Sequence, residues 1–267
     1  MNKENLSENR LLYLKEKKRK KIVILSFQIG ILATFLLLWE VLAKFKIIDS
    51  FLMSMPSNIL YTIKDLFLSG DLFTHIFTTL YETLLGFMIA TILGSIIAIF
   101  LWCSEYLRKI LEPYIVVLNS LPKIALGPII IVWFGAGTKS IVFMAIIITI
   151  IVTIITMENG FLSVDKNKIK LLKTFGANKT QILFKLILPA STKTFVSCLK
   201  INVGMSWIGS IMGEYLVSKQ GIGYLIVYGG QVFKLDLVMA STVILCLLAG
   251  LMYLIVVILE KFINKRH

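Results

Sequence analysis

Four polar or charged side chains stand within long apolar stretches of this sequence, or at their edges. They are Lys123, Lys200, Asn202 and Glu214. A charge within an apolar helix is costly unless it faces a polar cavity, meets a partner or extends its head group to water. We predict that these residues line a polar path. Pairing or extension to water stays open for Lys200, an interfacial position stays open for Glu214, and Glu82 could pair with Asn202 between helices.

Catalytic and metal-binding patterns are missing from the sequence. His75 and His267 have no metal-like neighbours, and the three Cys residues show no CxxC spacing. No nucleophile stands beside a general base, and no GxxxxGK[ST] phosphate-binding run occurs. We therefore expect no catalytic centre, no metal site and no cofactor in this chain.

The composition is that of a membrane protein. Hydrophobic residues make up 57% of the chain and charged residues 16%, with a mean hydropathy of +0.86, whereas a soluble domain has roughly 25% charged residues. In lipid the backbone must satisfy its own hydrogen bonds, which leaves helices or a closed barrel. The apolar runs are longer than barrel strands and do not alternate with polar residues. The sequence therefore predicts an all-α, polytopic membrane protein.

Six apolar segments are long enough to cross a bilayer, which takes about 20 residues. They cover residues 22–43, 75–102, 111–134, 140–158, 190–217 and 235–262, and the third is interrupted by Pro122 and Pro128. Residues 56–70 predict a short amphipathic helix on the membrane surface. A small residue at every fourth position, from Gly86 to Ala98, favours close helix packing in lipid.

The positive charge is concentrated on one side of these segments. The net charge is +13, and residues 1–21 form a basic tail ahead of the membrane domain at 22–267. With six crossings, most of the 28 Lys and Arg residues share the side that holds both chain ends. Basic loops mark the cytoplasmic side. We therefore expect both termini to be cytoplasmic, and the charge needs no nucleic-acid partner.

The basic stretch at residues 163–189, here called the knob, has signals for two short helices and a turn. Asp165 can cap the first helix, Gly176 permits a sharp turn, and Asn178 with Gln181 resembles a capping box. Pro189 ends the second helix. A rigid knob between two membrane helices is suited to transmit a push, although an ordinary loop held to lipid head groups by its lysines would have the same charge.

The knob and several other runs resemble those of ABC importer permeases. The run GANKTQILFKLILP at 176–189 resembles the second half of their EAA loop, with the Gly and the Leu-Pro ending at matching positions. The acidic-Ala-Ala opening differs, since Lys170, Leu171 and Leu172 stand there. Further runs resemble the nitrate/sulfonate/taurine-type branch: MPS at 55–57, GDL at 70–72, TLYETLLGF at 79–87, LPKIALGP at 121–128, WFGAG at 133–137, and Glu214 followed by GIGYLI at 221–226.

The resemblance implies a type I ABC importer in the bacterial cell membrane. Two permease subunits, usually identical, would sit on two ATPase subunits that carry ATP and magnesium, and an extracellular binding protein would deliver the solute. The knob would contact the ATPase. The residues implied in that contact are Lys173, Phe175, Gly176, Ala177, Asn178, Lys179, Gln181 and Pro189.

The solute is left open by the sequence. The branch includes carriers of nitrate, sulfonates and taurine, and also of thiamine precursors and riboflavin. A secondary transporter that works without an ATPase is the alternative class. It would usually show inverted repeats and coupling-ion residues at the midplane, and neither is visible here.

Overall fold

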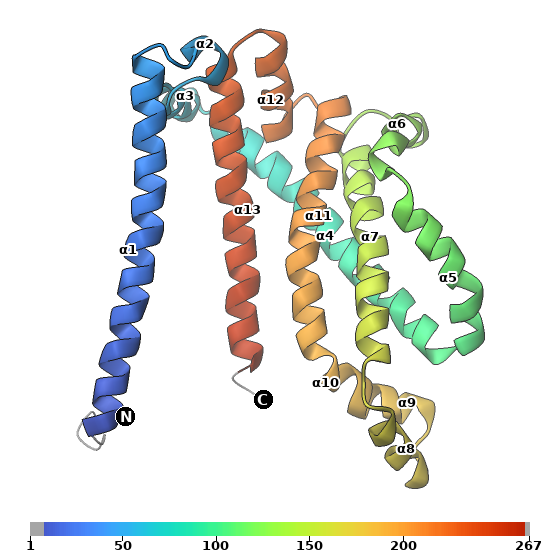
Figure 1. Cartoon of the computed structure of the whole chain (residues 1–267). Helices are drawn as coiled ribbons and strands as arrows, with labels where there is room; N and C mark the ends of the chain where they lie inside the picture. The colour runs from blue at the N-terminus through green and yellow to red at the C-terminus, as the bar shows by residue number, and fades with distance from the viewer. Residues whose placement is uncertain (1–7, 265–267) are drawn as a thin grey trace.

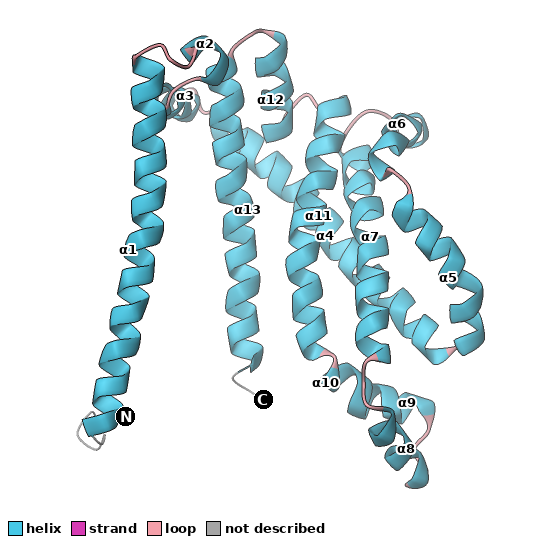
Figure 2. Ribbon diagram, in the orientation of Figure 1, coloured by secondary structure: helices cyan, strands magenta, loops and turns pink. Residues whose placement is uncertain are grey.

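The computed structural model describes residues 8–264, which form helices and no strands (Figure 2). Residues 1–7 of the predicted tail and His267 lie outside the described residues. Within 8–264, five helices are long and apolar enough to cross a membrane, and there are six if the bent pair of α5 and α6 is counted as one span. The five are α1 (Glu8–Lys44), α4 (Asp71–Cys103), α7 (Thr138–Leu162), α11 (Thr192–Val217) and α13 (Leu235–Asn264). The prediction of about six membrane helices is confirmed.

The third predicted segment is bent where the sequence has its prolines. Helix α5 (Glu105–Ser120) is followed by a 3₁₀ turn, η2 (Lys123–Leu126), and by α6 (Gly127–Phe134), and the two halves of the crossing meet at 87°. Pro122 and Pro128 lack the N–H that a continuous helix requires. The predicted interruption of this segment is confirmed.

Helices α4 and α7 pack closely along the predicted stripe of small residues. Gly86, Ala90, Gly94 and Ala98 are all buried. A Cβ atom at Gly86 would lie 2.4 Å from Ala145 Cβ, and one at Gly94 would lie 2.7 Å from Thr153 Cβ. Only small residues allow the two backbones to approach this closely, so the stripe is a packing surface.

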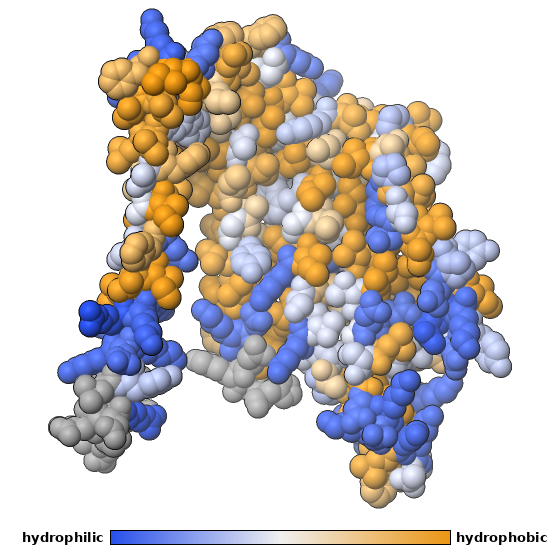
Figure 3. Space-filling model, viewed as in Figure 1, coloured by the Kyte–Doolittle hydropathy of each residue, from blue (hydrophilic) through white to orange (hydrophobic). Residues whose placement is uncertain are grey.

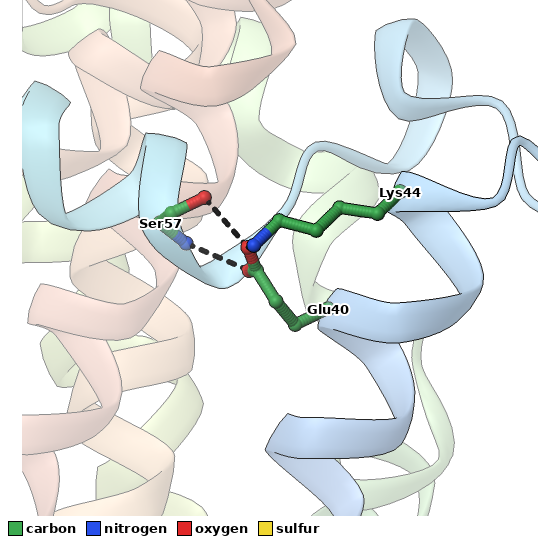
Figure 4. A network of polar contacts seen from close by, with 3 residues as sticks. All are labelled: Glu40, Lys44 and Ser57. Carbon is green, nitrogen blue, oxygen red and sulfur yellow. Dashed lines mark hydrogen bonds and ion pairs between the residues drawn. The ribbon is translucent and has the colours of Figure 1, made fainter.

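Helix α1 begins at Glu8 rather than at residue 22 and continues through the basic run at residues 15–21. Lys, Arg, Glu and Leu are good helix formers, so the run can extend the apolar helix. At the other end of α1, Glu40 accepts hydrogen bonds from Ser57 N at 3.1 Å and Ser57 Oγ at 3.0 Å (Figure 4). Lys44 Nζ lies 3.0 Å from the same carboxylate. These contacts tie α1 to the start of α3 (Pro56–Leu68), the predicted amphipathic helix.

The short helices divide between the two ends of the bundle. Helices α2 (Ser50–Met53), α3, α6 and α12 (Ile222–Gln231) lie at the end opposite to the chain termini (Figure 1). Helices α8 (Lys166–Thr174) and α9 (Lys179–Ile182) project from the end where α1 begins and α13 finishes (Figure 1). Hydrophilic residues gather at this second end, with hydrophobic residues above them (Figure 3). Helix α12 was not predicted, because the sequence of residues 218–234 indicated only a connecting segment that contains Gly and Tyr.

Candidate functional site: the knob and the buried polar contacts

The first helix of the knob begins and ends where the sequence predicts. Asp165 accepts a hydrogen bond from Asn167 N at 2.8 Å and so caps α8. At its other end Gly176 has φ +81°, with Gly176 N bonded to Lys173 O and Ala177 N bonded to Leu172 O, both at 3.0 Å. This pair of bonds is a Schellman motif, which satisfies the last carbonyl groups of the helix. The turn therefore depends on a residue that tolerates positive φ.

The second helix starts with the predicted capping box. Asn178 Oδ1 accepts from Gln181 N at 2.8 Å, and Gln181 Oε1 accepts from Asn178 N at 2.9 Å. The helix then widens into a π-helical turn, η3 (Leu183–Ile187), and continues as α10 (Leu188–Ala190) before α11. Pro189 lies inside α10 and has no N–H to donate to the turn before it, which accounts for the departure from α geometry.

The knob is fixed to the membrane helices by an apolar root. Ile182, Leu183 and Ile187 are buried and pack in one cluster with Met157 and Phe161 of α7. Ala98 of α4, Cys198 of α11 and Val164 belong to the same cluster. The knob therefore packs on three membrane helices at once.

The surface of the knob carries apolar side chains that this chain leaves uncovered. Phe175 is 78% exposed, and Leu171 and Phe184 are also exposed. Large apolar groups exposed amid lysines mark a surface that binds another protein or a membrane. Leu171 and Phe184 were not among the predicted contact residues. Their sequence pattern, an apolar residue within a basic stretch, could have indicated them.

The predicted coupling residues mostly lie on the knob surface. Ala177 is half-buried against the apolar root, and Lys179 Nζ reaches the carbonyl of Cys103 at the end of α4, at 3.4 Å. The exposed members of the set are Lys173, Phe175, Gly176, Asn178, Lys179, Gln181 and Pro189.

The four predicted path residues are held by separate partners. Lys200 Nζ lies 2.7 Å from Glu260 Oε2 of α13, so its charge is paired. Lys123 Nζ donates to Asn119 O at 3.1 Å beside the bend between α5 and α6. The structure therefore does not bring these two lysines together.

Asn202 is fully buried where α4, α7 and α11 meet. Its amide Nδ2 donates to Thr91 Oγ1 at 2.8 Å, and its Oδ1 accepts from Thr153 Oγ1 at 3.2 Å. The suggested pairing of Asn202 with Glu82 is wrong, because Thr91, further along α4, takes the amide hydrogen.

Glu214 is buried beneath the first turn of α12. Its Oε2 accepts from Gly223 N at 2.7 Å and from Tyr224 N at 3.3 Å. Two side chains of α4 take the preceding N–H groups: His75 Nδ1 accepts from Gly221 N at 2.9 Å and Thr79 Oγ1 from Ile222 N at 2.8 Å. Four successive N–H groups at the start of α12 are thus satisfied by α4 and α11, which holds α12 against both helices.

Comparison with curated proteins finds transport permeases. The chain is 27% identical over 233 residues to the putative aliphatic sulfonates transport permease protein SsuC of Bacillus subtilis, covering 87% of this chain and 84% of that protein. It is 24% identical over 250 residues to the taurine transport system permease protein TauC of Escherichia coli, covering 91% and 90%. It is 30% identical over 190 residues to the formylaminopyrimidine transport permease protein ThiX of Halalkalibacterium halodurans, covering 71% and 75%.

Solved structures share the fold. The MetNI methionine ABC transporter in an inward-facing conformation matches with a TM-score of 0.64 at 17% identity, over 74% of this chain and 97% of that chain. A bacterial ABC transporter that imports alginate matches with a TM-score of 0.64 at 12% identity, over 93% and 99%. The model of the binding-protein-dependent transport system inner membrane component matches residues 90–267, more than half of the chain. This chain therefore belongs to that family of ABC transporter permeases, and to a branch that resembles its sulfonate and taurine members.

Proposed function

We propose that this chain forms the membrane pathway of an ATP-driven importer and that its knob binds a separate ATPase subunit. The observation that carries the proposal is the form of the knob. Its root is buried among α4, α7 and α11, and its surface exposes Leu171, Phe175 and Phe184. An apolar surface on a rigid root is suited to receive a push and pass it to membrane helices.

The orientation follows from the charges. The basic run of α1, the knob and the end of α13 all lie at one end of the bundle (Figures 1 and 3). Basic segments next to membrane helices face the cytoplasm. We therefore place the knob and both chain ends in the cytoplasm, where an ATPase subunit and ATP are available.

The assembly we propose contains two permeases, two ATPase subunits and an extracellular binding protein. Helix α5 has no buried residue, which supports a second permease copy beside it. ATP and magnesium would be bound by the ATPase subunits, since this chain has no phosphate-binding run of its own.

For the solute we propose a small compound of the kind carried by the relatives. A sulfonate-, taurine- or nitrate-like anion is the first choice, and a thiamine precursor such as a formylaminopyrimidine, or a riboflavin-like compound, is the second. Lys123, Lys200, Asn202 and Glu214 stay candidates for the path. Their separate partners indicate contributions at different levels rather than one binding site.

Copurification and transport together test the proposal. The permease, expressed with its neighbouring genes, should bring down an ABC ATPase subunit, and reconstituted vesicles should take up solute only with ATP and binding protein. A secondary transporter would instead move solute without an ATPase. Uptake that needs only an ion gradient would therefore reject the proposed function.

A further inference from the structure

Two buried carboxyl groups meet beneath the first turn of α12. Glu82 of α4 and Glu214 of α11 are each 1% exposed. Contacts on both sides of them join the same stretches of chain: Thr83 Oγ1 lies 2.6 Å from Ser210 Oγ, and Thr79 Oγ1 accepts from Ile222 N, next to the Gly223 N–H that Glu214 accepts. Neither forms one of the ion pairs found within residues 8–264. Two carboxyl groups that can ionise are therefore buried side by side in a membrane protein, where an unpaired charge is costly.

Each carboxyl group has one oxygen without a hydrogen-bond partner. The two atoms are Glu82 Oε2 and Glu214 Oε1. The other Glu214 oxygen, Oε2, already accepts two backbone N–H groups of α12. Ionised carboxylates only accept hydrogen bonds, so two of them cannot satisfy each other. Two adjacent carboxylates also repel, and one of them normally keeps a proton.

The groups around the pair supply no positive charge. The described side chains beside the pair are Thr79 and Thr83 of α4 and Ser210 of α11, which are hydroxyl groups, and Tyr215 of α11 is the next residue after Glu214. The imidazole of His75, one turn from Thr79, uses Nδ1 as an acceptor for Gly221 N and is stacked on the ring of Tyr224. No Lys or Arg is among these described neighbours.

We propose that Glu82 and Glu214 form a proton-binding site that holds one proton. Glu82 is the neutral partner, and its Oε2–H donates to Glu214 Oε1. This single proton gives a partner to both unsatisfied oxygens. Glu214 keeps the negative charge because it accepts from the N-terminus of α12, where the helix dipole and free N–H groups favour an anion.

Packing favours a proton over a metal cation at this site. A Cβ atom at Gly221 would lie 2.2 Å from Glu214 Oε2, and one at Gly223 would lie 2.9 Å from the same atom. Hard cations such as calcium and magnesium take about six oxygen ligands, and backbone N–H groups fill one side of Glu214. A proton needs only the two oxygens that are free.

The proton can be detected by infrared difference spectroscopy, wild type minus variant, of the purified permease complex in an ester-free detergent at neutral pH. A neutral carboxylic acid shows a C=O stretching band that a carboxylate lacks. The wild-type complex should show this band, and Glu82→Gln should lose it. The matched control is Glu260→Gln, whose carboxylate is paired with Lys200, and this variant should keep the band. If Glu82→Gln does not fold, Glu82→Asp should shift the band instead.

Stability separates the proton from the alternatives. Glu82→Gln should keep the wild-type melting temperature, because an amide N–H can donate to Glu214 in place of the acid. Glu214→Gln should lower it, because the amide cannot match the carboxylate as acceptor for α12. Absence of the band in the wild type, or its persistence in Glu82→Gln, overturns the proposal. A bound cation would also overturn the proposal. It would be indicated if the band is missing and the melting temperature rises with sodium or potassium but not with choline. The proton site does not depend on the solute carried, so failure of the transport experiment leaves it standing.

Discussion

Lys200 Nζ and Glu260 Oε2 lie 2.7 Å apart and join α11 to α13. Glu260 stands near the end of α13, and its charge has no other ion-pair partner among the described residues. The charge of Lys200 can therefore be explained by a structural role in this ion pair, as an alternative to a role in contacting solute.

The reversed pair distinguishes these two roles of Lys200. We expect Lys200→Leu to reduce uptake, because it leaves the carboxylate of Glu260 unpaired. If the charge acts through the pair, Lys200→Glu combined with Glu260→Lys should restore both the melting temperature and uptake. Restored stability without restored uptake would instead support contact of Lys200 with solute. The measurements are vesicle uptake and thermal unfolding of the same preparations.

Gly176→Val should uncouple the permease. Positive φ at Gly176 costs a side-chain residue about 1–2 kcal/mol, and valine is further restricted by its branched Cβ. The turn should shift and misaim the second helix of the knob, so uptake and binding of the ATPase should both fall while membrane insertion persists. Gly176→Asn should be milder, since Asn tolerates this conformation. Lys166→Ala, an exposed residue at the start of α8, is the control. Normal uptake by Gly176→Val with bound ATPase would show that the knob is not the coupling element.

Phe175→Asp should weaken binding of the ATPase without destabilising the permease. The side chain is 78% exposed in this chain, so little packing is lost on substitution. Phe175→Leu keeps an apolar group and should bind nearly as well as the wild type. Pull-down of the ATPase, with thermal unfolding of the isolated permease alongside, gives both readouts. An unchanged yield of ATPase with Phe175→Asp would place the contact elsewhere on the knob.

Asn202→Leu should destabilise the bundle. The change removes the amide that donates to Thr91 Oγ1 and the oxygen that accepts from Thr153 Oγ1, at a site where the Asn side chain is fully buried. Thr153 keeps its other bond, to Thr149 O at 2.9 Å. Hydrogen bonds between membrane helices contribute about 1 kcal/mol each, so a loss of roughly 1–2 kcal/mol is expected. Thr78→Val is the control, because that hydroxyl bonds only its own helix backbone. Thermal or denaturant unfolding in detergent measures the difference, and equal stability of the two variants would contradict it.

Cysteine labelling tests the orientation. With the native cysteines replaced, Asn178→Cys should resist a membrane-impermeant thiol reagent in intact cells and react after the membrane is opened. Ser69→Cys, at the end of α3, should react in intact cells, because α3 lies at the opposite end of the bundle (Figure 1). Labelling of both positions from outside would refute the proposed topology.

The structure of the knob could be predicted because its signals are local. Asp165 caps a helix two residues away, Gly176 ends that helix, and Asn178 and Gln181 bond each other across one turn. Each contact joins residues that are close in sequence, so residue type and spacing are sufficient. The bend at Pro122 follows the same logic, since proline acts on its own backbone.

The contacts that hold the start of α12 could not be predicted, because they join distant parts of the chain. His75 and Thr79 bond N–H groups more than a hundred residues away, and the burial of Glu214 depends on how α4 and α11 pack. A sequence pattern identifies Glu214 as an acid in an apolar helix but not the side of that helix it occupies. The pairing of Lys200 with Glu260 has the same origin.

The bonds of Glu40 to Ser57 make the end of α1 that lies away from the chain termini a pivot. Helix α1 contacts the described chain mainly there, through α2 and α3, and its central apolar window has no buried residue. From Glu40 back to Glu8 the helix is about 48 Å long at 1.5 Å per residue. A tilt of about 10° at the pivot would therefore carry the basic end of this lever roughly 8 Å along the membrane surface. The contacts of α1 with α2 and α3 at one end of the helix thus determine where its other end lies in the bilayer.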